Sequence, residues 1–165
     1  MVHHTQRRER GVTLFEMLIV VALIGLIAGF SYPSVVSGLD TLRMRTASDQ
    51  VVSFFSAALD RADRRQQVVE IQILPAQNKL IARSSDLSFM RQLIISDPAR
   101  IVAVYPALPG VIVAEGVAPP PRRFLLYPGG AVPAIGVELA TFKGRRRLVH
   151  LDPMTGTARA EVQAQ

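Results

Sequence analysis

One carboxylate stands inside a long apolar run near the N-terminus. Residues 12–30 read VTLFEMLIVVALIGLIAGF, and only Thr13 and Glu16 in this run are polar. A charged carboxylate within a membrane span costs about 2.5–3.5 kcal/mol on insertion scales, so Glu16 needs a cation nearby or stays protonated. The run contains no basic residue. An amino group freed at Val12, on this chain or on a neighbour, would supply the cation, so the chemistry predicted here is ion pairing.

The apolar run is predicted to be a helix that crosses a membrane. Nineteen helical residues extend about 28 Å, close to the thickness of the hydrocarbon core. The run also lacks the polar stripe of a surface helix. Arg7, Arg8 and Arg10 precede it and the next basic residue is Arg43, so the positive-inside rule places the N-terminus in the cytoplasm. The alternatives are a buried helix of a soluble protein and a secretory signal peptide, which lacks a good small-residue cleavage site here.

The segment that begins at Arg10, RGVTLFEMLIVV, resembles the class III signal of type IV pilins and type II secretion pseudopilins. In that family a prepilin peptidase cuts after the glycine on the cytoplasmic side and methylates the new N-terminal residue. The resemblance implies that Gly11 is the cleavage residue and that Val12 becomes the N-methylated terminus. It also implies that Glu16 is the assembly residue, which pairs with the terminal amine of an adjacent subunit.

The same resemblance implies domains, partners and a location. Residues 1–11 would be a cleaved basic leader and residues 12–32 the transmembrane and filament-core helix. Gly25 in this helix and Pro33 just after it fall where family members carry helix-loosening residues. The implied partners are other pilin-like subunits, the prepilin peptidase and the inner-membrane assembly platform. The protein would lie in the inner membrane as a single-pass subunit with a periplasmic C-terminal domain, and later in the filament.

Residues 33–66 are predicted to form an amphipathic helix. Proline lacks an N–H and crowds the preceding turn, so Pro33 is expected to kink or loosen the helix where this segment begins. Apolar residues recur at steps of three and four, as in a helix that packs one face on a core. They are Leu42, Ala47, Val51, Phe54, Phe55, Ala58, Leu59 and Ala62.

Residues 67–165 are predicted to form a β-rich globular head. Short alternating runs bounded by turn signals favour an antiparallel sheet or a small β-sandwich that leans on the helix. The fold class is therefore α+β, with a long N-terminal helix, part membrane span and part amphipathic, packed on this domain. The expected strands are 68–74, 79–83, 89–95, 101–105, 111–114, 123–127, 137–142, 147–151 and 157–162.

The basic run 143–147, KGRRR, is the most tempting site in the head. Arg145, Arg146 and Arg147 suit contacts with a nucleic acid backbone. The favoured interpretation is a solvated hairpin turn with Gly144 at the bend, because no interleaved aromatic residues offer a stacking surface. Nucleic acid is therefore not the expected partner.

Composition excludes several kinds of site. The chain has no cysteine, which removes disulfides, thiolate nucleophiles and cysteine-based metal sites. His150 is expected to be an exposed strand residue without metal-binding partners, and Glu115, Glu138, Asp86 and Asp97 show no spacing typical of an acid–base pair. No phosphate loop or nucleophile motif appears. We therefore expect no enzyme activity, no cofactor and no metal.

A second, less specific resemblance concerns the C-terminal half. The Tyr127-Pro128-Gly129-Gly130 turn, the strand after Gly136 and the Asp152-Pro153-Met154-Thr155-Gly156 element resemble the layout of the minor pseudopilin H type and related minor pilins. This resemblance implies a structural subunit of a type II secretion pseudopilus. The alternatives are a DNA-binding minor pilin of a type IV pilus and, from another class, a membrane-tethered exported enzyme.

Overall fold

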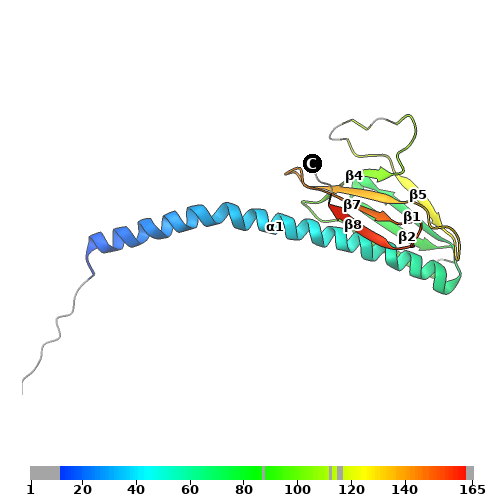
Figure 1. The fold of residues 1–165 in the computed structure, drawn as a ribbon, viewed down its shortest axis with the longest axis horizontal. Coiled ribbons are helices and arrows are strands. Elements are labelled where there is room, and N and C mark those ends of the chain that lie inside the picture. The colour runs from blue at the N-terminus through cyan, green and yellow to red at the C-terminus, as the bar shows by residue number, and fades with distance from the viewer. Residues whose placement is uncertain (1–11, 87, 112, 115–116, 163–165) are drawn as a thin grey trace, which may run out of the picture. The chain divides into compact units, whose positions relative to one another are not determined.

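The computed structural model describes residues 12–86, 88–111, 113–114 and 117–162, apart from the side chains of residues 30–37. The chain divides into two compact units, Met1–Leu39 and Asp40–Gln165, which we call the N-terminal unit and the C-terminal unit. One helix, α1 (Leu14–Arg65), contributes residues to both (Figure 1).

Helix α1 has recognisable start and stop signals. The Thr13 hydroxyl accepts a hydrogen bond from the Glu16 N–H at 3.2 Å, so Thr13 acts as the N-cap. At the other end Gln66 adopts a left-handed backbone conformation with φ 50°, and the Gln67 N–H donates to the Ala62 carbonyl at 3.2 Å. This geometry satisfies an end carbonyl in the manner of a Schellman motif.

The C-terminal unit contains two antiparallel four-stranded sheets. The first has the order β3-β2-β1-β5 and the second β4-β6-β7-β8. Their strands are β1 (Val69–Leu74), β2 (Lys79–Ser84), β3 (Met90–Ile94), β4 (Arg100–Tyr105), β5 (Arg122–Leu126), β6 (Gly136–Ala140), β7 (Arg146–Leu151) and β8 (Ala158–Val162).

The sheets and the C-terminal part of α1 share one hydrophobic core, so the predicted α+β fold with a helix packed on antiparallel sheets is confirmed (Figure 1). On the helix the buried residues are Met44, Ala47, Val51, Phe54, Phe55, Ala58 and Ala62. On the strands, alternate residues point into the core, and the burial of β1 alternates along its whole length.

Asn78 links the two sheets. It follows the short 3₁₀ helix η1 (Pro75–Gln77) and lies in the left-handed region with φ 51°. Its side chain donates to the Ala99 carbonyl at 3.0 Å and accepts from the Ile101 N–H at 2.9 Å. Its own carbonyl accepts from the Ile95 N–H at 2.8 Å. Asn78, beside the first sheet, thus holds the start of β4 in the second.

Two expectations about the head and helix were wrong. The strand predicted at 111–114 is absent, because Val111, Val113 and Ala114 lie in irregular backbone between β4 and β5 (residue 112 lies outside the described residues). The Val111 N–H instead donates to the Leu108 carbonyl in a turn. Leu42 was predicted on the buried stripe but is 60% exposed, and Met44 is buried instead. Met44 precedes the buried Ala47 by three residues and shares its face of the helix, whereas Leu42 precedes it by five and falls on another face.

Candidate functional site

The first turn of α1 presents a single acid among apolar side chains. Glu16 lies in this turn and is exposed, as are Val12 and Phe15. A negative charge at a helix N-terminus is favourable, because the unpaired N–H groups there carry partial positive charge. Within the N-terminal unit, no described side chain forms an ion pair with Glu16.

The rest of the described N-terminal helix is apolar and exposed on all sides. Gly25 lies in this stretch, and a Cβ added there would meet nothing within 4 Å. Pro33 lies inside α1, and Gly11 and the rest of the 1–11 leader lie outside the described residues. Such a continuous apolar surface is typical of a segment that another molecule covers. The exposed large residues are Val12, Leu14, Phe15, Met17, Leu18, Ile19, Val20, Val21, Leu23, Ile24, Leu26 and Ile27.

The basic run forms the predicted hairpin turn, between β6 and β7. The Thr141 N–H donates to the Arg145 carbonyl at 3.0 Å, and Gly144 takes φ 79°, which favours glycine. The cations of this turn are less solvated than the sequence indicated. Lys143 pairs with Asp40 and Arg145 donates to the Thr41 hydroxyl, so both reach the first residues of the C-terminal unit's helix.

Arg146 points to the other face of the second sheet, where it meets a buried acid. Its Nη1 lies 2.9 Å from Oε1 of Glu138, which is only 3% exposed. The Tyr105 hydroxyl donates to Oε2 of the same carboxylate at 3.0 Å. Burial, followed by this hydrogen bond to a carboxylate, raises the pKa of Tyr105. From the sequence, Glu138 was only one of several scattered acids, because its partners Tyr105 and Arg146 lie on other strands.

These three residues are part of the lining of a cleft with a volume of about 980 Å³. One wall is the outer face of β4 and β6, and the other is the segment between β4 and β5. Glu138 has both carboxylate oxygens occupied by partners in its own chain. The arrangement is that of a structural ion pair, in which each carboxylate oxygen accepts one hydrogen bond from another strand of the same sheet.

His150 lies on the same outer face and is more buried than predicted, with 28% of its side chain exposed. Its Nε2 lies 3.8 Å from Oε1 of Glu161 on β8, and its buried Nδ1 has no hydrogen-bond partner among the described atoms. Across the described residues, no three histidine or acidic side chains gather in a way that could hold a metal ion.

Comparison with known families places a motif at the N-terminus. Residues 6–32 match the family model for the prokaryotic N-terminal methylation motif. The chain therefore carries a type IV pilin-like signal, and this match spans the second half of the leader, Glu16 and the whole apolar run. No curated protein and no solved structure matched the chain. A search of the described residues found no helix with both the length and the apolar character that crossing a membrane requires.

Proposed function

We propose that this chain is a structural subunit of a pilin-like filament, most closely a minor pseudopilin of the H type in a type II secretion pseudopilus, and that it has no enzyme activity. The carrying observation is the methylation motif at residues 6–32, which contains one exposed acid, Glu16, in the first turn of an otherwise apolar helix. The exposed apolar surface behind it supports the same proposal, because helices packed in a filament would cover it.

The proposed mechanism is assembly. The prepilin peptidase cuts after Gly11 and methylates the amine of Val12, which leaves the whole apolar helix in the mature protein. This helix resides in the inner membrane with the C-terminal unit in the periplasm, and the assembly platform then moves it into the filament. The membrane step is supported by the motif and by the composition of residues 12–30, which contain one ionisable side chain.

Glu16 guides docking in this mechanism. Its carboxylate pairs with the terminal amine of the adjacent subunit as apolar surfaces close around both groups. Charge pairing of this kind gains strength when water is excluded, and a mispositioned subunit would leave the carboxylate buried and unpaired. The pair therefore selects the axial position at which a subunit enters.

The test is a matched pair of variants in the native host. Glu16→Gln keeps the size of the side chain and removes its charge, while Glu70→Gln makes the same change on β1, where the acid contacts Arg123 of its own unit. We expect the Glu16 variant to be cleaved and membrane-associated but missing from sheared or cross-linked filaments. The Glu70 variant should assemble normally, and equal assembly of both variants would contradict the mechanism.

Two further measurements address processing and the machine. Mass spectrometry of the native protein should show an N-methylated Val12 as its first residue, whereas an intact Met1 in a host with active peptidase would contradict the proposal. Deletion of the gene should abolish protein secretion and leave pilus-dependent motility intact. The reverse phenotype would assign the subunit to a type IV pilus instead.

A further inference from the structure

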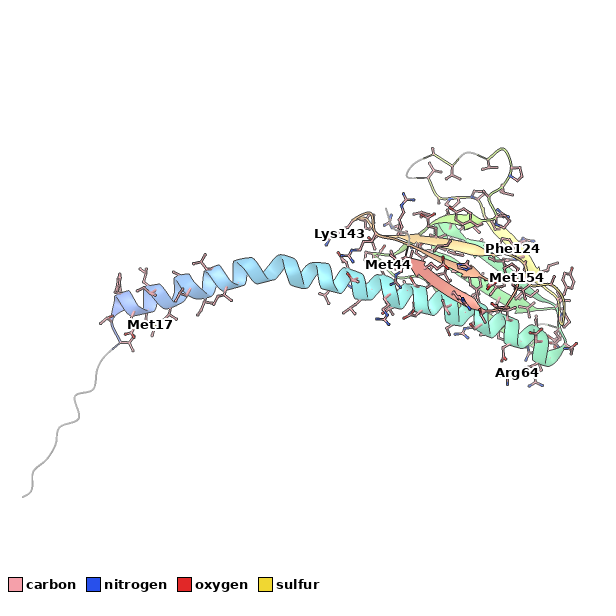
Figure 2. The ribbon with its side chains drawn as sticks, viewed as in Figure 1. Met17, Met44, Arg64, Phe124, Lys143 and Met154 are labelled. Carbon is pink, nitrogen blue, oxygen red and sulfur yellow. The ribbon has the colours of Figure 1, made fainter. Side chains whose placement is uncertain are left out.

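A small hollow opens where the β6–β7 hairpin meets the start of the C-terminal unit's helix. Its volume is about 350 Å³, within the range of small-ligand sites. The residues Lys143 and Met44, which belong to its wall, lie close together at one end of the unit, and Arg64 lies at the other end (Figure 2). We call this the basic hollow, and its lining is Thr41, Met44, Lys143, Gly144, Arg145, Arg146, Arg147 and Val162.

Positive charge around the hollow exceeds the negative charge that the described residues place there. Lys143, Arg43 and Arg145 all act on the single carboxylate of Asp40, and the hydrogen bond from Lys143 is the main cause of the lowered pKa of Asp40. Arg147 adds a fourth cation, and it forms no ion pair with any described residue. One acid against four cations leaves a site that attracts anions.

Arg146 does not contribute to this excess, because it is paired with the buried Glu138. Arginine side chains suit a phosphate in particular, since the guanidinium presents several N–H donors that match its oxygens.

We propose that the basic hollow binds the phosphate of an anionic phospholipid in the membrane that holds the N-terminal helix. The inference rests on the proposed function, which supplies the membrane. Asp40 follows the end of the expected span, residue 32, by eight residues, and even a fully extended chain of that length reaches only about 28 Å. The hollow is therefore tethered close to the headgroups.

Nucleic acid fits the hollow less well. Affinity for a duplex comes from several phosphates contacted in a row, whereas the cations of this hollow gather around one volume of about 350 Å³. Phe142, the aromatic residue of the turn, lines the other cleft, where the Arg100 guanidinium lies 4.2 Å from its ring centroid, so it offers the hollow no stacking surface. A single phosphate is the better match.

The test uses the full processed chain in phosphatidylcholine nanodiscs with and without phosphatidylglycerol. Hydrogen exchange of the amides in residues 141–147 reports contact at the hollow. Each cation near an anionic membrane surface contributes a factor of about five to binding. We expect slower exchange only when phosphatidylglycerol is present, with the difference removed by high salt.

Variants assign the effect to the hollow. Arg145→Gln/Arg147→Gln should remove the lipid-dependent protection. Arg43→Gln/Arg147→Gln should weaken binding to the phosphatidylglycerol nanodiscs by about 25-fold or less, and it leaves the contacts of the hairpin to the helix intact. The control, Arg64→Gln/Arg65→Gln, removes the same charge at the other end of the unit and should behave as wild type. Thermal unfolding of each variant checks the fold.

Each other outcome overturns the proposal. Equal exchange in both nanodiscs shows that the hollow does not bind the anionic lipid. A control variant that loses as much protection as the hollow variants shows the same. Protection by inorganic phosphate that phosphatidylglycerol cannot exceed assigns the site to a free anion, and protection by a DNA duplex alone assigns it to nucleic acid. A processed chain that does not enter nanodiscs at all refutes the proposed membrane function as well, so the two failures are distinguishable.

Discussion

The buried ion pair between Glu138 and Arg146 predicts a specific pattern of stability. Arg146→Met removes the cation and keeps a side chain of similar length, so Glu138 stays buried with only the Tyr105 hydroxyl as a partner. The Glu138 side chain is 4% exposed, whereas the Arg146 side chain is 54% exposed. The perturbation therefore removes a solvent-facing cation from a carboxylate that solvent barely reaches.

The magnitude follows from that asymmetry. Breaking a fully buried pair costs about 3–5 kcal/mol, because the remaining charge is left uncompensated. Since water already reaches half of the Arg146 side chain and screens the pair, we expect a smaller loss of about 2 kcal/mol. Glu138→Gln in the same background removes the stranded charge and should recover about half of the loss.

The assay is urea unfolding of the full chain in mild detergent, followed by circular dichroism. With a denaturant slope of about 2 kcal/mol per molar, Arg146→Met should lower the midpoint by about 1 M. Arg123→Met is the matched control, because its partner Glu70 is more exposed and the pair is longer, at 3.7 Å. The reasoning is refuted if both single variants lose the same stability, or if the double variant with Glu138→Gln is less stable than Arg146→Met alone.

The remaining predictions concern one junction and two titrating groups. Asn78→Ala should lower the free energy of unfolding by about 3 kcal/mol in the same assay. The change removes two hydrogen bonds and leaves an alanine, which has no polar side chain, at positive φ. Asn78→Asp keeps the acceptor for the Ile101 N–H and should lower the free energy of unfolding by about half as much. Because its pKa is raised in the fold, Tyr105 contributes stability that is complete below the unfolded pKa of about 10 and is lost as pH rises further, so Tyr105→Phe should flatten this alkaline loss in urea midpoints. Hydrogen bonds from Ser84, then Ser88, hold the pKa of Asp86 well below its usual range, so its contribution is present above the unfolded pKa of about 4 and is lost as pH falls; Asp86→Asn should reduce the acid sensitivity, and an unchanged acid midpoint would contradict this assignment.

Much of the fold could be read from local patterns. Eight of the expected strands correspond to β1–β8 within a few residues, because alternation along a half-buried strand is visible in the sequence itself. The turn at Pro128–Gly130 was also correct, with Gly129 at φ 60° and the Gly130 N–H bonded to Tyr127. The prediction of a strand at 111–114 was wrong, because the sequence of a short apolar run does not show whether a neighbouring strand is available to pair with it.

The sequence alone determined the N-terminal signal, since a glycine, an acid and an apolar run at fixed spacing are local features that need no fold to be read. Tertiary structure decided which distant residues meet. It paired β1 with β5, brought Arg146 to Glu138 and closed the hairpin onto Asp40 to make the basic hollow. Contacts between residues far apart along the chain depend on how the sheets pack around the helix, and composition and periodicity carry no record of that packing.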